Sequence, residues 1–163
     1  ILRRMMALCV EEMSDGLCAR ENEQRLLRNM DVHVAVLDLL KIPYDKAEDT
    51  RMNHIMRLAH NLLQYFCYEN PTNQAKLFEL YFNDYHQISE EQEVETCCYI
   101  FMNNVQLCKT ITEKHIQHFV HLIELHGRKM LYIKFLQTIV KAENQYIKNC
   151  QDIVMSEGVG NAK

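Results

Sequence analysis

Four histidines in the second half of the sequence have the spacing that most resembles a metal site. His115, His118 and His121 follow one another at intervals of three, and His126 comes shortly after them. Zinc needs ligands that converge on one point, which a helix offers between side chains three or four residues apart. The apolar residues of this segment, however, define an inner helix face that leaves His118 and His121 on the far side, and no Cys or Asp completes the set. We therefore expect solvated or inter-helix histidines and no metal ligand.

The acidic residues Glu90, Glu91, Glu93 and Glu95 could instead bind a hard cation such as calcium. A calcium loop needs alternating oxygen ligands around a glycine turn, and this stretch has neither. Carboxylates in the first turn of a helix are favoured by the helix dipole, and Ser89 before them is a typical N-cap. The stretch therefore predicts a solvated helix start, capped by Ser89.

Thiols and hydroxyls offer no nucleophile constellation. The seven cysteines are odd in number, form no CxxC motif and lie mostly within helical apolar patterns. They are therefore expected to be reduced core thiols of a cytosolic protein, although a sensing thiol among them stays open. The three serines, Ser14, Ser89 and Ser156, all lie at expected helix ends. No GxSxG, Walker, GxGxxG or HExxH motif occurs, so we expect no enzyme, no catalytic residue and no cofactor.

Composition indicates the class of element that carries these residues. The chain has 163 residues, of which 48% are hydrophobic, and its formal net charge of −4 is too small for a disordered chain. With only 4 glycines and 2 prolines, it lacks the turn residues that an all-β protein of many short strands needs. An all-α fold is therefore expected.

Charge and hydropathy limit the partners. The densest basic pairs, Arg3-Arg4 and Arg128-Lys129, are too small to hold nucleic acid or a polyphosphate alone. No apolar run approaches the roughly 20 residues that a membrane span requires. We therefore expect no nucleic acid, no membrane contact and no small-molecule ligand. Because Ile1 already lies in an amphipathic pattern, we expect the chain to be a piece of a longer polypeptide.

Apolar residues at intervals of three and four predict about nine helices joined by short polar loops. A step of 42 residues relates apolar positions along the chain, for example Val36 to Phe78 to Val120 and Leu63 to Val105. This period lies in the range of roughly 40–47 residues of armadillo and HEAT repeats. The sequence thus predicts an armadillo/HEAT-like α-solenoid, with one helical domain over 1–157 and a flexible tail over 158–163. The expected helices are 2–13, 23–30, 31–40, 50–68, 73–82, 89–108, 112–126, 131–140 and 146–154.

Several long stretches resemble the inositol trisphosphate receptor, including Gln-Arg-Leu-Leu-Arg-Asn-Met at 24–30. They are similar to the second copy of the domain that ryanodine and inositol trisphosphate receptors share, in the central cytosolic part of those chains. Two stretches, 14–23 and 82–95, depart from the family's pattern. The other matching stretches are 36–46, 55–60, 101–108, 117–128, 132–143 and 150–152.

The resemblance implies a part of a tetrameric, ligand-gated calcium release channel, at the cytosolic face of the endoplasmic reticulum membrane. In such receptors a helical solenoid links ligand and calcium binding to pore opening, so the implied partners are other domains and subunits of the channel. The family's trisphosphate-binding residues lie outside the matched stretches, so no site residue is carried over. A ryanodine receptor segment and an armadillo-type adaptor that binds peptides remain alternatives.

Overall fold

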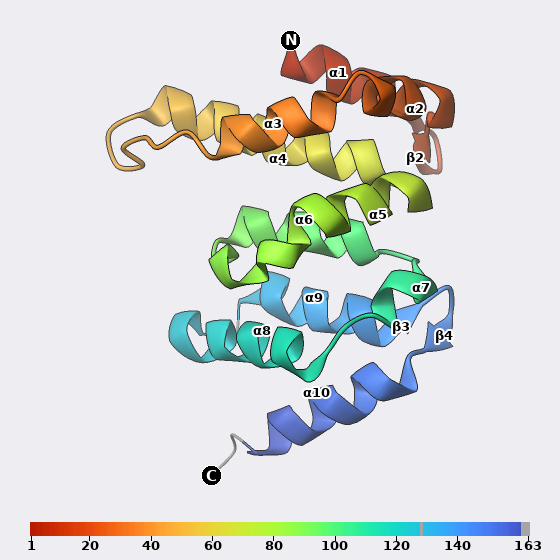
Figure 1. Cartoon of the computed structure of the whole chain (residues 1–163), viewed down its shortest axis with the longest axis vertical. Coiled ribbons are helices and arrows are strands. Elements are labelled where there is room, and N and C mark those ends of the chain that lie inside the picture. The colour runs from red at the N-terminus through yellow and green to blue at the C-terminus, as the bar shows by residue number, and fades with distance from the viewer. Residues whose placement is uncertain (128, 161–163) are drawn as a thin grey trace. The chain divides into compact units, whose positions relative to one another are not determined.

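The computed structural model describes the backbone of residues 1–127 and 129–160 and the side chains of 1–127 and 129–157. Over these residues the fold is all-α, as the sequence predicts, and is consistent with a helical solenoid-like architecture (Figure 1). Ten α-helices, one 3-10 helix and two small hairpins make up the described part. The chain divides into two compact units, Ile1–Tyr81 and Phe82–Lys163. The single domain expected over 1–157 stays a prediction.

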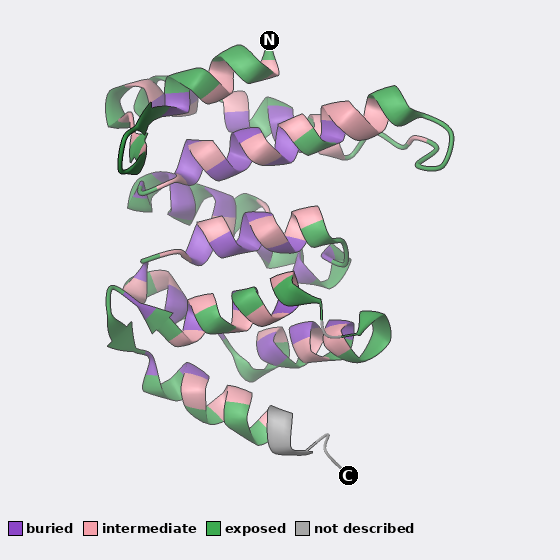
Figure 2. Cartoon of the chain, turned by 180° about the vertical axis from the view of Figure 1, so that it is seen from behind, coloured by how far each residue is buried: buried purple, intermediate pink, exposed green. Residues whose placement is uncertain are grey.

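The first unit is built around one long helix, α4. This helix packs against α1, α2, α3 and α5. Ala59, Leu62, Leu63 and Phe66 of α4 are almost completely buried, as the predicted inward face requires. Buried segments recur along the ribbons of the helices in Figure 2. The elements of this unit are α1 (Leu2–Cys9), β1 (Val10–Met13), β2 (Gly16–Ala19), α2 (Glu21–Asn29), α3 (Val32–Leu40), α4 (Thr50–Cys67) and α5 (Pro71–Leu80).

The hairpin formed by β1 and β2 corrects the first predicted helix, which was expected to continue to Met13. The helix ends at Cys9, and Met13 pairs with Gly16 across the turn at Ser14-Asp15. Gly16 has a φ of +134°, which is accessible to glycine and strained for other residues. Ser-Asp-Gly is therefore a hairpin turn here, where the sequence indicated only the end of a helix.

The second unit has an aromatic core. The rings of Phe119 and Phe135 are 3.9 Å apart, and Phe82 meets Phe101 edge to face at 4.8 Å. Helix α9 packs against α6, α8 and α10 around these rings. The elements are η1 (Phe82–Gln87, a 3-10 helix), α6 (Glu91–Phe101), α7 (Val105–Cys108), α8 (Glu113–His126), α9 (Met130–Val140), β3 (Lys141–Ala142), β4 (Gln145–Tyr146) and α10 (Lys148–Gly160).

Several predicted boundaries were wrong by a few residues. The helix expected over 89–108 is interrupted between Phe101 and Val105, and Tyr146 lies in β4 rather than in the last helix. Helix α5 begins at Pro71, because proline is well tolerated at the first helical position. Helix α10 is described to Gly160, within the expected tail, and residues 161–163 lie outside the described residues.

One helix–turn–helix junction occurs in both units with nearly the same backbone. Tyr68 (φ −59°, ψ 121°) and Met102 (φ −55°, ψ 121°) are each followed by a residue with φ +51°. In both, the backbone N–H of the next residue, Asn70 or Asn104, donates to the carbonyl three residues earlier, which makes a type II turn. Each Asn side chain then caps the following helix.

These turns lie 34 residues apart, from Asn70 to Asn104, whereas the step that relates apolar positions in the sequence is 42 residues. The step of 42 takes Leu63, near the C-terminal end of α4, to Val105 at the start of α7, so it does not relate equivalent positions there. Its apolar matches reflect the helical period that all these segments share.

Candidate functional site

A buried polar network joins three helix ends of the first unit. We call it the Gln24 network, and it consists of Gln24, Arg28, Asn70 and Asn73. Gln24 and Arg28 lie one turn apart on α2 and therefore share a face. Asn70 caps α5, and Asn73 lies in its first turn. Gln24 and Asn73 are completely buried.

Gln24 satisfies the end of α4. Its Nε2 donates to the carbonyl oxygens of Tyr65 at 2.9 Å and Tyr68 at 3.0 Å. Carbonyls at the C-terminal end of a helix lack the usual partner four residues on, and the Tyr65 carbonyl otherwise accepts only a longer bond of 3.3 Å from the backbone N–H of Tyr68. The Oε1 of Gln24 accepts a hydrogen bond from Asn70 Nδ2 at 2.9 Å, so both ends of the amide are used.

Asn73 continues the network across the same turn. Its Nδ2 donates to the carbonyl oxygen of Phe66 at 2.7 Å, and its Oδ1 accepts from Arg28 Nη1 at 2.6 Å. Its backbone N–H donates to Asn70 Oδ1 at 3.1 Å. Because every bond here is buried or partly buried, each would be costly to break, and the junction of α2, α4 and α5 is held in one arrangement.

The sequence did not predict the Gln24 network. Gln24 and Arg28 belong to the resembling stretch at 24–30, and Asn70 lies between the helices predicted over 50–68 and 73–82. A usable signal existed, because Gln24 shares a helix face with the buried Leu27, where an apolar residue is expected. Which groups it would bind could not be read locally, since its partners lie more than 40 residues away.

His33 lies beside this junction as a buried titratable group. Its ring stacks on Phe66 with centroids 5.1 Å apart and an interplanar angle of 11°. Burial lowers the pKa of His33. The negative charge of Asp31 raises it, whereas the positive charges of Lys76 and Arg28 lower it further. Its Nδ1 has no hydrogen-bond partner among the described residues. The ring is therefore held as a neutral, stacking group.

In the second unit, three of the histidines gather with Tyr85 in what we call the imidazole cluster: His86, His115, His118 and Tyr85. The Tyr85 ring lies 4.5 Å from His115 and 5.5 Å from His118, and His86 lies 6.1 Å from His118. His118 Nε2 is 2.8 Å from the carbonyl oxygen of Ile88, which can only accept, so Nε2 carries the proton. These contacts attach η1 and the segment after it to α8.

His115 also caps its own helix. Its Nδ1 accepts a hydrogen bond from the backbone N–H of Thr112 at 3.1 Å, in a capping box at the start of α8. Burial lowers the pKa of His115, and the neighbouring His86 and His118 lower it further. The neutral imidazole is therefore the form that the cap requires, because a protonated Nδ1 cannot accept.

The four histidines considered as possible metal ligands lie in different environments in the structure. His115 and His118 lie between helices, one of the two environments expected, although His118 faces η1 rather than the far side. His121 is exposed and lies 3.5 Å from Glu124, and His126 is exposed near Tyr132. Over the described residues, no three His, Cys, Asp or Glu side chains are grouped so as to hold a metal ion.

The acidic stretch forms the helix start that the sequence predicts, with a different cap. The N-cap of α6 is Glu90 rather than Ser89, and Glu93 completes a capping box. Glu93 Oε2 accepts from the backbone N–H groups of Ser89 and Glu90 at 2.8 and 2.9 Å. Lys129 Nζ donates to Glu91 at 2.6 Å. The carboxylate of Glu93 therefore caps the start of the helix, and the carboxylate of Glu91 forms an exposed ion pair.

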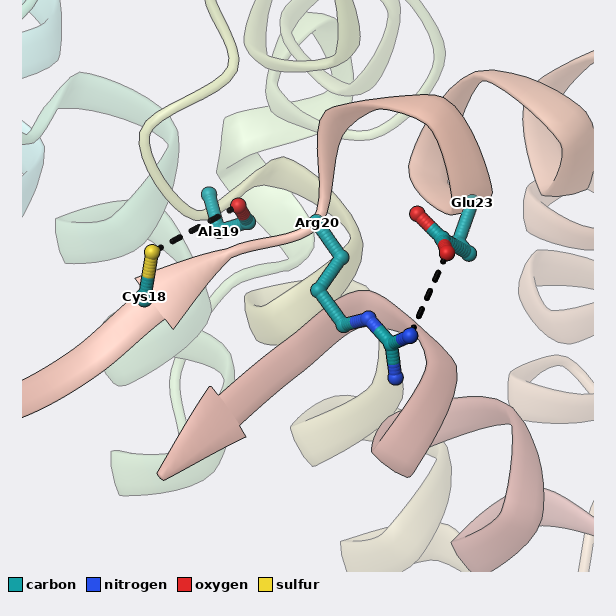
Figure 3. A network of polar contacts seen from close by, with 4 residues as sticks. All are labelled: Cys18, Ala19, Arg20 and Glu23. Atoms are coloured by element: carbon teal, nitrogen blue, oxygen red, sulfur yellow. Dashed lines mark hydrogen bonds and ion pairs between the residues drawn. The ribbon is translucent and has the colours of Figure 1, made fainter. Parts of the chain in front are cut away.

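All seven cysteines are free, and six are buried, which confirms core thiols for those six. Burial raises the pKa of Cys9, Cys98 and Cys108 to about 12, so these thiols stay protonated and unreactive. Cys18 on β2 is the exposed one, with its Sγ 3.8 Å from the carbonyl oxygen of Ala19 (Figure 3). The adjacent Arg20 turns to Glu23, at 3.3 Å, and not to the thiol.

No helix among the described residues has both the length and the apolar character needed to cross a bilayer. A sequence profile of the RIH domain matches residues 10–158. The chain is also 32% identical over 157 residues to the inositol 1,4,5-trisphosphate receptor itr-1 of Caenorhabditis elegans, a match that covers 87% of this chain and 5% of that receptor. Both findings confirm the resemblance read from residues such as 24–30. The chain is a member of the RIH-domain family.

Proposed function

We propose that this chain is a helical module of a ligand-gated calcium release channel, positioned at the cytosolic face of the endoplasmic reticulum membrane. Its role is to transmit ligand and calcium binding elsewhere in the channel to the pore. Membership of the RIH-domain family and the similarity to an inositol trisphosphate receptor support the channel assignment. The proposed partners are neighbouring domains and subunits of the same channel, and no catalytic role is proposed.

The Gln24 network is the observation that carries the relay role. A segment that transmits displacement must move as a rigid body, with its helices fixed to one another. The network fixes the ends of α2, α4 and α5 through side-chain amides and backbone carbonyls. Allosteric coupling amounts to about 1–3 kcal/mol, which is similar to the cost of leaving one buried polar group unpaired. Loss of a single network residue is therefore sufficient to weaken the coupling.

The test uses a full-length receptor that contains this sequence, with Asn73→Ala introduced. This change leaves the carbonyl of Phe66 and the guanidinium of Arg28 without their partner. We expect the trisphosphate concentration for half-maximal calcium release from microsomes to rise several-fold, with trisphosphate binding unchanged. Calcium efflux and equilibrium ligand binding are measured on the same membranes.

Asn22→Ala is the matched control, because Asn22 lies on the exposed side of α2 and its side chain bonds only with the exposed Arg25 among described groups. We expect this variant to release calcium as the unmodified receptor does. If Asn73→Ala also gives an unchanged release curve at equal protein level, the relay role is wrong.

A further inference from the structure

Two arginines and a histidine meet at the surface of the first unit, on α1 and α4. Arg3 Nη2 lies 3.3 Å from His54 Nε2, and Arg57 Nη2 lies 3.0 Å from His54 Nδ1. Both arginines are exposed, and His54 is partly exposed. Helices α1 and α4 pack side by side, which brings Arg3 to residues more than 50 positions away in sequence (Figure 1). We call this set the Arg-His-Arg row.

The row has more hydrogen-bond donors than acceptors. A guanidinium group only donates, whereas a neutral imidazole offers one accepting nitrogen and one N–H. His54 can therefore accept from Arg3 or from Arg57, but not from both, and a protonated ring accepts from neither. At least one guanidinium group thus faces a nitrogen that cannot satisfy it.

The remaining guanidinium donors form no ion pair with another described side chain. Within the described part of the chain, neither Arg3 nor Arg57 pairs with a carboxylate. Three of the other five arginines of this unit have a side-chain acceptor, since Arg20 binds Glu23, Arg25 binds Asn22 and Arg28 binds Asn73. Arg4 and Arg51 have none among the described groups, but neither of them faces a second arginine across an imidazole. Two positive charges held beside one imidazole without an anion cost free energy that a bound anion would recover.

We propose that Arg3, His54 and Arg57 form a binding site for a phosphate-type oxyanion. A carboxylate carries a single negative charge and presents its acceptor directions in one plane, which a single guanidinium fork matches best. Phosphate oxygens point in several directions, so a phosphate or diphosphate group can accept from both guanidinium groups at once. An anion between them also removes the conflict at His54, because the ring then needs to face only one donor.

The folded chain brings together basic residues that lie far apart in the sequence. Arg3-Arg4 alone was judged too small to hold a polyphosphate, and Arg57 stood in another segment of the sequence. The packing of α1 on α4 joins the two halves of the row. This site lies outside the relay network and goes beyond the proposed function, so either proposal can fail without the other.

The test is titration of the folded chain with sodium pyrophosphate at low ionic strength, where exposed charges are least screened. Binding is followed by calorimetry and by the NMR signals of the His54 ring. We expect one saturable site, with a shift of the His54 signals. Arg57→Gln and Arg3→Gln should each weaken binding about tenfold, the loss expected for one charge-assisted contact.

Arg25→Gln is the matched control, since Arg25 is exposed on α2 and its acceptor is Asn22. We expect it to bind pyrophosphate as the unmodified chain does. Absence of saturable binding, or equal weakening by Arg25→Gln and Arg57→Gln, overturns the site, because attraction to net charge would then explain the data.

A second arm identifies the source of the phosphate. Vesicles of phosphatidylcholine with and without a phosphatidylinositol phosphate are sedimented with the chain. Sedimentation that depends on the phosphorylated lipid and is lost in Arg57→Gln indicates a lipid headgroup. Pyrophosphate binding without sedimentation indicates a soluble phosphate compound, and both outcomes support the site.

Discussion

Among individual residues, a few polar side chains are as deeply buried as the aliphatic core. Gln24, Asn73 and Thr96 have no exposed surface. Polar groups persist at such positions only when they are hydrogen-bonded, and then their replacement is costly because the partners lose their bonds as well. Gln24 is the clearest case, since three described groups depend on its amide.

Gln24→Leu should therefore destabilise the chain although leucine fits the buried face. The change removes the Gln24 donor from the carbonyls of Tyr65 and Tyr68 and the Gln24 acceptor from the Asn70 amide, which we expect to cost about 3 kcal/mol of unfolding free energy. Urea unfolding followed by circular dichroism measures it. Asn29→Leu, at an exposed position of the same helix, should change stability by less than about 0.5 kcal/mol. Similar losses in both variants would contradict the role of Gln24.

The lowered pKa values of two histidines predict that the stability of the chain depends on pH. Burial lowers the pKa of His33 and of His115 in the folded chain, so the unfolded chain binds protons more readily. The associated stability is present above the unfolded value, near 6.5, and is lost progressively as the pH falls below it. The urea midpoint should thus decrease from pH 7.5 to pH 5. His33→Phe, which keeps the stacking, should flatten this decrease, and an unchanged slope would contradict it.

Among the helices and turns, the two type II junctions determine where helices end. Glu69 and Asn103 both have a φ of +51°, in the left-handed region. Asn tolerates this region because of its short polar side chain, whereas Glu is strained there.

Glu69→Gly should therefore stabilise the chain by about 0.5–1 kcal/mol, because glycine relieves the left-handed strain. Asn103→Gly should have a smaller effect. Thermal unfolding of both variants against the unmodified chain measures the difference, and a destabilised Glu69→Gly would show that the turn is held by that side chain instead.

The helices and their inward faces could be predicted from the sequence because apolar periodicity is a local signal. Val94, Cys97 and Phe101 are buried on α6, as the pattern indicates. The junction at Asn103-Asn104 has no Gly or Pro, so one helix was predicted across it, whereas the junction that contains Pro71 falls between the helices predicted over 50–68 and 73–82. The η1 helix and the β1–β2 hairpin were missed because their form depends on packing against distant segments.

Much of the candidate site could not be predicted, because it also depends on contacts between segments far apart in the sequence. The histidine spacing at 115–121 was visible, but His86 and Tyr85 come from a stretch with no helical pattern. The Gln24 network and the Arg-His-Arg row each combine residues more than 40 positions apart. Such partners are chosen by tertiary packing, which no local spacing encodes.

Over the whole molecule, the two units are stabilised differently. The first contains a network of amides around α4, and the second a core of packed aromatic rings. Both units bury cysteines as ordinary core residues, which makes thiol accessibility a measure of how completely the chain is folded.

One of the seven thiols should react with a water-soluble disulfide reagent in the native chain. Cys18 is exposed, whereas the other six are buried and the pKa values of Cys9, Cys98 and Cys108 are raised. Cys18→Ser should abolish the fast reaction, and all thiols should react in denaturant. Fast labelling of a second thiol under native conditions would show that part of the core opens readily.

The bonds that Gln24 and Asn73 make to backbone carbonyls have a consequence for sequence change. A carbonyl is present whatever side chain its residue carries, so side-chain exchanges at positions 65 and 68 leave these bonds in place, whereas Phe66 is constrained separately by its burial and its stacking on His33. Positions 24 and 70 bind each other through their side chains, so a replacement at one leaves the other mismatched. Over evolutionary time, these two amides are expected to be retained or exchanged together.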